Sequence, residues 1–251
     1  MISKSMHSSG VNPDDCGDGT TPSPSNFGLV ISGGFGSGGR LSSVESFPTT
    51  SNNLCNIPDL PDARGRHTLS LLEFTQTLVV CGGPMHWDSC ISWKHGQTSW
   101  SSYATLNPVR VDHSAVSFGD RLLLVGGTGE SGETGVELPT GRIFPMHQPA
   151  SDACLIPQND GFIVTGGLHL DGTVVDAYSS TGDFVSSLPS FEVGRRGHGC
   201  GSFVDEDGAR VLLIAGGRAI ETDTDYLSIL HICPFSLLAQ VFSTENVQFP
   251  T

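Results

Sequence analysis

A short apolar run that ends on two consecutive glycines recurs five times along the chain. The copy Leu122-Leu123-Leu124-Val125-Gly126-Gly127 shows the pattern clearly. The second glycines of successive copies are 49, 44, 40 and 50 residues apart. Recurrence at such a period is typical of a repeat architecture, in which each copy is one supersecondary unit. The five doublets are Gly33–Gly34, Gly82–Gly83, Gly126–Gly127, Gly166–Gly167 and Gly216–Gly217.

Each doublet stands within a unit of four predicted strands. The first is opened by an arginine and a histidine, as in Arg64-Gly65-Arg66-His67, and the apolar run is the second. A third carries an acid, as in Val174-Val175-Asp176-Ala177-Tyr178, and a short fourth closes the unit. Short strands separated by turn residues at regular spacing predict an all-β fold. We expect one domain over residues 27–245, a disordered lead over 1–26 and a C-terminal tail over 246–251.

The net charge and the hydropathy of the chain argue against nucleic acid and membrane partners. Twelve basic residues against 26 acidic ones give a net charge of −14. That field repels phosphate backbones and anionic lipid surfaces, so we expect no nucleic acid partner. The apolar stretch from Tyr226 to Phe242 is shorter than the roughly 20 residues that span a bilayer, so we expect no membrane insertion. We expect a monomer that takes a protein or peptide ligand.

The cysteines and the N-terminus leave the compartment open. Residues 1–7 lack the apolar core of a signal peptide, which favours the cytoplasm unless the true start is missing. Seven cysteines cannot all pair within the chain. Cys81 and Cys90 flank a loop between two strands and form a possible disulfide. We favour buried free cysteines as the general interpretation, although the count also suits an oxidising compartment.

These features resemble the kelch-repeat family of β-propellers. The five doublets, the acid and aromatic after them, and Trp100 carry the resemblance over about residues 28–217. It implies a propeller of four-stranded blades, about five of which are visible, within what would be an incomplete six-bladed ring. The first repeat lacks its innermost strand. Gln240 to Phe249 could supply it, or the ring stays open.

In kelch propellers the loops after the doublets and the links between blades bind partner peptides, and the resemblance implies the same face here. Arginine recognises carboxylates well, so we expect an acidic or polar partner segment. The alternative is that the repeated Arg and His residues bond loop carbonyls in every blade. The candidate partner-binding residues are Arg40, Arg64, Arg66, His86, Trp87, Arg110, Arg195, Arg196 and Arg218.

Three alternatives to a non-catalytic scaffold are a histidine metal site, a copper oxidase and an extracellular binding module. His67, His113 and His198 recur with the repeat, which favours a structural role over a metal site. A copper oxidase like galactose oxidase needs two tyrosines and two histidines, and the chain has three tyrosines, two of them at ordinary repeat positions. An extracellular, disulfide-bearing adhesion or carbohydrate-binding module is the third. We expect no catalytic residues, no metal and no cofactor.

Overall fold

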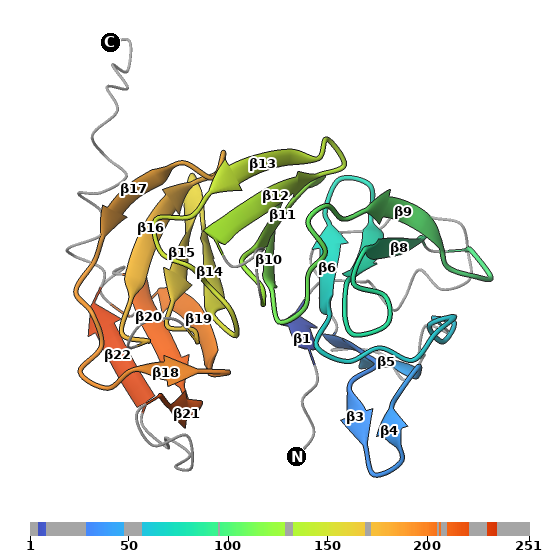
Figure 1. Cartoon of the computed structure of the whole chain (residues 1–251), viewed down its shortest axis with the longest axis horizontal. Coiled ribbons are helices and arrows are strands. Elements are labelled where there is room, and N and C mark those ends of the chain that lie inside the picture. Colours follow the sequence, from blue (N-terminus) through green and yellow to red (C-terminus); the bar gives the residue numbers. More distant parts are fainter. Residues whose placement is uncertain are drawn as a thin grey trace. The chain divides into compact units, whose positions relative to one another are not determined.

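The computed structural model describes residues 5–8, 29–47, 57–94, 96–128, 133–168, 172–204, 206, 210–220 and 230–234. The regular elements of these residues are β-strands, and no α-helix occurs among them (Figure 1). The same stretches contain no helix long and apolar enough to cross a bilayer. The predicted all-β class is confirmed, and the architecture is propeller-like.

The strands form five successive sheets. The first has the order β1–β2–β5, from Ser5–Ser8, Leu29–Ser32 and Val44–Phe47. The second contains β6 Thr68–Leu72, β7 Thr77–Cys81, β8 Ser89–Lys94 and β9 Ser101–Thr105. The third contains β10 Ser114–Phe118, β11 Arg121–Val125, β12 Thr134–Leu138 and β13 Arg142–Pro145.

The fourth sheet contains β14 Cys154–Gln158, β15 Gly161–Thr165, β16 Val175–Ser179 and β17 Phe184–Ser187. The fifth has the order β19–β20–β22, from Gly199–Val204, Arg210–Ala215 and Leu230–Pro234. Two small two-stranded ribbons accompany these sheets. After the first glycine doublet, β3 Phe35–Gly36 pairs with β4 Gly39–Arg40. β18 Arg195–Arg196, just before β19, pairs with β21 Arg218–Ala219, just after the last doublet. The second and fourth sheets are antiparallel meanders throughout.

The innermost strand of the first sheet comes from the N-terminal segment. β1 pairs antiparallel with β2, with Met6 opposite Ile31 and Ser8 opposite Leu29. The predicted disordered lead over residues 1–26 is therefore wrong at Ser5–Ser8. The alternative source of this strand, Gln240 to Phe249, lies outside the described residues.

The chain divides into two compact units. Unit 1 comprises Met1–Ser131 and Val136–Ile143, and unit 2 comprises Gly132–Gly135 and Phe144–Thr251. The division falls within β12 and β13. Each unit has its own apolar core.

In unit 1 the side chains of β7 alternate between two cores. Leu78 and Val80 pack with Val30 and Leu69 between the first two sheets. Val79 and Cys81 contribute instead to a second cluster, which includes Leu122 and Leu124 of the third sheet. Successive strand residues point to opposite faces, and a strand with sheets on both sides reads as a continuous apolar run. That is why the runs before the doublets are uniformly apolar.

In unit 2 the fourth and fifth sheets share one core. Ile156 and Ile163 pack against Leu212 and Ile214, and Phe191 from the connecting segment closes the cluster. A second link joins these sheets covalently, because Cys154 of β14 and Cys200 of β19 form a disulfide.

Candidate functional site

Both residues of every glycine doublet have a positive φ, between 53° and 126°. At the second doublet, a Cβ added to Gly82 would lie 2.6 Å from the carbonyl oxygen of Arg110 and 2.7 Å from Cε1 of His113. A side chain here would both strain the backbone and collide with the next linker. The ten glycines predicted to be structural all have this positive φ, and at Gly33, Gly82 and Gly166 the linker of the following sheet crosses the end of the apolar strand.

The three repeated arginines stabilise that corner from within. Arg64, Arg110 and Arg195 each expose at most 1% of their surface. Their NH1 atoms donate to the carbonyl oxygen of the first glycine in the doublet of their own sheet. The distances are 3.0 Å for Arg64 to Gly82, 2.6 Å for Arg110 to Gly126 and 3.3 Å for Arg195 to Gly216. Burial lowers the pKa of all three guanidinium groups, that of Arg110 to about 10. Proposed above as partner contacts, these three arginines instead lie inside the fold.

The three repeated histidines connect neighbouring sheets. Nε2 of His67 lies 3.0 Å from Ser32 Oγ, and Nε2 of His198 lies 2.8 Å from Thr165 Oγ1. Burial, reinforced by the neighbouring arginine, lowers the pKa of each of these two histidines to about 4. His113 bonds the preceding sheet through Thr68, and burial lowers its pKa to about 3. Over the described stretches, no group of three or more His, Cys, Asp or Glu side chains could hold a metal ion.

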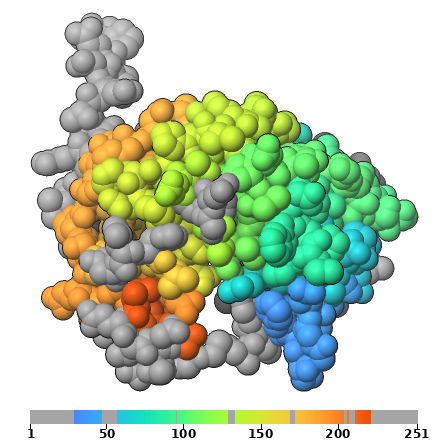
Figure 2. Space-filling view, in the orientation of Figure 1, coloured from blue at the N-terminus to red at the C-terminus, as the bar shows by residue number. Residues whose placement is uncertain are grey.

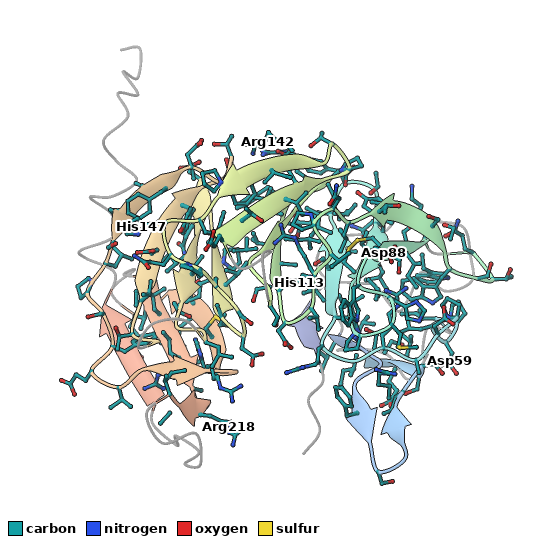
Figure 3. All side chains as sticks on the ribbon, viewed as in Figure 1. Asp59, Asp88, His113, Arg142, His147 and Arg218 are labelled. Carbon is teal, nitrogen blue, oxygen red and sulfur yellow. A yellow bond between two sulfur atoms is a disulfide. The ribbon has the colours of Figure 1, made fainter. Side chains whose placement is uncertain are left out.

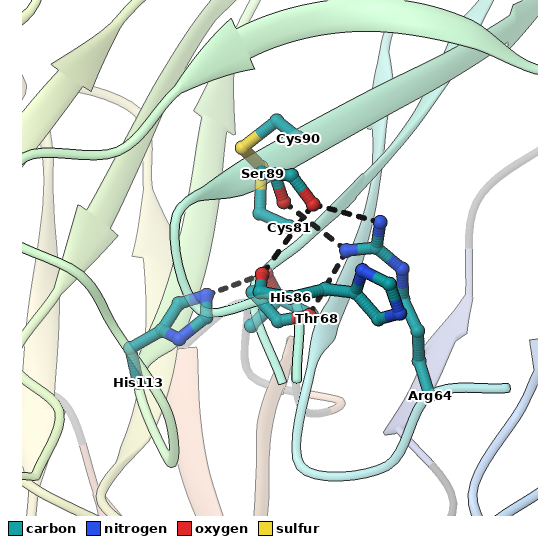
Figure 4. The surroundings of a disulfide bond; sticks show 8 residues. Arg64, Thr68, Cys81, His86, Ser89, Cys90 and His113 are labelled. Carbon is teal, nitrogen blue, oxygen red and sulfur yellow. Dashed lines mark hydrogen bonds between the residues drawn. A yellow bond between two sulfur atoms is a disulfide. The ribbon is translucent and has the colours of Figure 1, made fainter. Parts of the chain in front are cut away.

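One loop of unit 1, residues 82–89, is held at both ends; we call it the Trp87 loop (Figure 4). The predicted Cys81–Cys90 disulfide is present and joins the residues that flank it. Inside the base, the Arg64 guanidinium donates to the carbonyl oxygen of Ser89 at 3.1 Å and to its hydroxyl at 2.9 Å. Backbone bonds from His86 to Gly83 and from Ser89 to His86 fix the turn. The loop is thereby pre-organised.

The Trp87 loop exposes apolar side chains. Met85 is 77% exposed and Trp87 is 50% exposed. The backbone N–H of Arg110 donates to the carbonyl oxygen of Trp87 at 2.9 Å. This bond holds the backbone of the preceding residue, Val109, near that of Trp87, and Val109 is 46% exposed. We call these three residues the Trp87 patch. Met85 has a φ of 78°, a left-handed conformation that non-glycine residues rarely adopt.

The cations around this patch are mostly engaged. Arg66 pairs with Asp112 at 2.8 Å, and His86 Nε2 lies 3.8 Å from Asp62. Arg40 is exposed on the β3–β4 ribbon, which projects from the surface in the space-filling view (Figure 2). Among the described residues Arg40 forms no ion pair, so it is the unneutralised cation on the predicted face of unit 1.

The remaining predicted residues lie in unit 2. Arg196 pairs with Asp152 at 3.2 Å and is mostly covered. Arg218 stands opposite Arg196 in the β18–β21 ribbon and is partly exposed (Figure 3). The structure therefore brings His86, Trp87 and the Arg66–Asp112 pair together on unit 1, and Arg196 and Arg218 together on unit 2.

Sequence reasoning missed a cluster around His147, on unit 2 (Figure 3). His147 Nδ1 lies 3.0 Å from the buried carboxylate of Asp176, which also accepts a hydrogen bond from Ser187 at 2.7 Å. The hydroxyl of Tyr178 accepts a bond from the His147 backbone N–H, and the Phe184 ring stacks on the imidazole. The acid and tyrosine of the third strand were the available signal. Burial raises the pKa of Tyr178 to about 12.

The cysteine interpretation requires a correction. Buried free thiols were favoured, yet four of the cysteines form the Cys81–Cys90 and Cys154–Cys200 disulfides. Pairing across adjacent strands places Cys81 directly opposite Cys90 in the β7–β8 register. Cys154 and Cys200 lie near the starts of the inner strands of neighbouring sheets, opposite Thr165 and Ile214 respectively.

No protein-family model matches the chain, and no curated protein matches it. Among solved structures, the one described as the structure of YjhT is similar. The likeness covers 86% of this chain and 73% of that one, with a TM-score of 0.60 and 14% sequence identity. At this identity the likeness shows the fold alone.

Proposed function

We propose that the chain is a non-catalytic interaction scaffold whose five sheets are blades of a kelch-type propeller. It binds a protein segment through the face formed by the loops after the doublets and the linkers between sheets. The observation that carries this proposal is the Trp87 patch, an exposed Met, Trp and Val on a loop clamped by a disulfide and a buried arginine. Tryptophan and methionine are enriched at interfaces, and pre-organisation lowers the entropic cost of binding.

The site is tested with random 12-residue peptides displayed on phage and selected on the full chain. The Trp87→Ser variant should weaken binding of the recovered peptides at least tenfold, because truncation of a central aromatic residue removes the anchor. The matched control is Phe74→Ser. Phe74 is 83% exposed and lies in the β6–β7 turn, at the other end of the same strand pair. If both variants retain full binding, this face is not the binding surface.

The two disulfides favour an oxidising compartment for this scaffold, since disulfides persist in such compartments. This is the specific support for the extracellular module as the second candidate function. The unreduced natural protein is alkylated and its mass is measured. Cys81, Cys90, Cys154 and Cys200 should remain unalkylated, because their disulfides protect them. Free thiols at all four positions would contradict the assignment. Stoichiometric copper in the purified protein would contradict the non-catalytic proposal.

A further inference from the structure

The charge around the Trp87 patch defines the chemistry of its partner. Of the nearby cations, Arg64 and Arg110 are buried and bonded to glycine carbonyls. Arg66 is neutralised by Asp112. The arginines that the sequence offers for an acidic ligand therefore do not present free charge beside Trp87.

Two exposed carboxylates border the same patch. Asp88 directly follows Trp87 and is exposed, and its backbone carbonyl accepts a bond from the Leu106 N–H at 2.6 Å (Figure 3). Asp62 is 54% exposed and lies near His86. Both acids act on Arg64, where they partly oppose the lowering of its pKa by burial. Asp62, beside His86, and Asp88, next to Trp87, are therefore the carboxylates that border the Trp87 loop.

A half-exposed tryptophan between carboxylates suits a cation. The face of an indole ring attracts Lys and Arg side chains electrostatically, and adjacent carboxylates add to that attraction. The net charge of −14 also draws cationic segments toward the molecule over longer range. Arg40, which forms no ion pair among the described residues, lies on the separate β3–β4 ribbon.

We propose that the Trp87 patch binds a protein segment in which a lysine or arginine stands beside an apolar residue. The cation lies against Trp87 between Asp62 and Asp88, and the apolar residue contacts Met85 and Val109. This inference rests on the proposed function and reverses the expectation of an acidic partner.

The phage selection on the full chain also tests this inference. Among peptides whose binding is lost in Trp87→Ser, lysine and arginine should be enriched at least twofold over the unselected library. Synthetic versions should bind the Asp62→Asn/Asp88→Asn variant about tenfold more weakly than the natural protein. Asp59→Asn/Glu73→Gln is the matched control, since both acids are exposed in unit 1 and neither belongs to the Trp87 loop.

The two proposals fail in different ways. Trp87-dependent peptides that are neutral or acidic, or that bind Asp62→Asn/Asp88→Asn normally, overturn the cationic partner and leave the scaffold proposal standing. Failure to recover any Trp87-dependent peptide overturns both. Unfolding midpoints within about 2 °C of the natural protein show that the variants are folded.

Discussion

Nε2 of His113 lies 3.0 Å from Oγ1 of Thr68. The other two repeat histidines bond a hydroxyl immediately before a glycine doublet, on Ser32 or Thr165. In the second sheet that position is Cys81, which is committed to the disulfide with Cys90. Thr68 faces Cys81 in the β6–β7 register and supplies the hydroxyl from the adjacent strand. Thr68 therefore gives His113 the hydroxyl partner that the disulfide-bonded Cys81 does not supply.

Thr68→Val should lower the free energy of unfolding by about 1–2 kcal/mol, because a buried imidazole nitrogen loses its hydrogen-bond partner. Urea unfolding measures the change. Thr105→Val is the control, since Thr105 is exposed in β9 and its substitution should change stability by less than about 0.5 kcal/mol. Equal stability of both variants would show that the His113–Thr68 bond contributes nothing.

Stability should fall between pH 6.5 and pH 4. The pKa values of His67 and His198 are lowered to about 4 and that of His113 to about 3. An unfolded histidine titrates near 6.5, so over this range the unfolded chain binds more protons than the folded one. Each histidine should then reduce the free energy of unfolding by about 2 kcal/mol at pH 5 relative to pH 7.5.

Chemical unfolding at pH 7.5, 6.5, 5.5 and 5.0 measures that dependence. His113→Gln removes one titrating group and should flatten the curve by about one third, since three buried histidines contribute. A curve of unchanged slope in His113→Gln would contradict the assigned pKa of His113.

Gly82→Ala should destabilise the chain far more than Gly141→Ala. Both glycines have a φ near 70°, but no heavy atom lies within 4 Å of a Cβ built at Gly141. Gly141→Ala should therefore cost only the backbone strain, about 1–2 kcal/mol. Gly82→Ala adds the collision with Arg110 and His113 and should cost at least about 3 kcal/mol. If urea unfolding shows similar losses of unfolding free energy for both variants, the crossing linker does not explain why these positions are glycine.

The two disulfides should differ in their rate of reduction. Cys81 and Cys90 are fully buried, whereas Cys154 and Cys200 are partly exposed. Thiolate attack requires access to a sulfur atom, so dithiothreitol at neutral pH should open Cys154–Cys200 first. Timed alkylation with peptide mapping measures the order. Earlier appearance of free Cys81 or Cys90 would contradict the burial of that pair.

The periodic glycines and the apolar runs before them predicted the all-β class and the four-stranded sheets that contain β7, β11 and β15. The positive φ values and the close approach of a linker both favour glycine, so the doublets mark these corners in the sequence. The strand Ser5–Ser8 was expected to lie in a disordered lead, because a four-residue segment with one apolar side chain, Met6, carries almost no periodic signal. The segment becomes a strand because it pairs with β2, and a pairing between residues so far apart in the sequence leaves no local sequence signal.

The site was harder to predict from the sequence. Arg64 and Arg66 are two residues apart, yet the first is buried under the Trp87 loop and the second is paired at the surface. The residue type alone does not distinguish the two roles. Which of the two side chains points into the fold depends on the left-handed backbone turn at Arg66. Trp87 was recognisable as the residue that does not recur with the repeat. The Cys81–Cys90 pair was recognisable from its position at two facing strand ends.

Fluorine NMR of the chain labelled with 5-fluorotryptophan tests the central claim most directly. The chain has three tryptophans. The indole N–H groups of Trp93 and Trp100 donate to carbonyls of Gln97 and Pro58 at 2.8 Å, whereas Trp87 is half exposed. Titration with a selected lysine-bearing peptide should shift the Trp87 resonance and leave the other two unchanged. A stationary Trp87 resonance with saturated binding, or shifts confined to Trp93 and Trp100, would contradict the account.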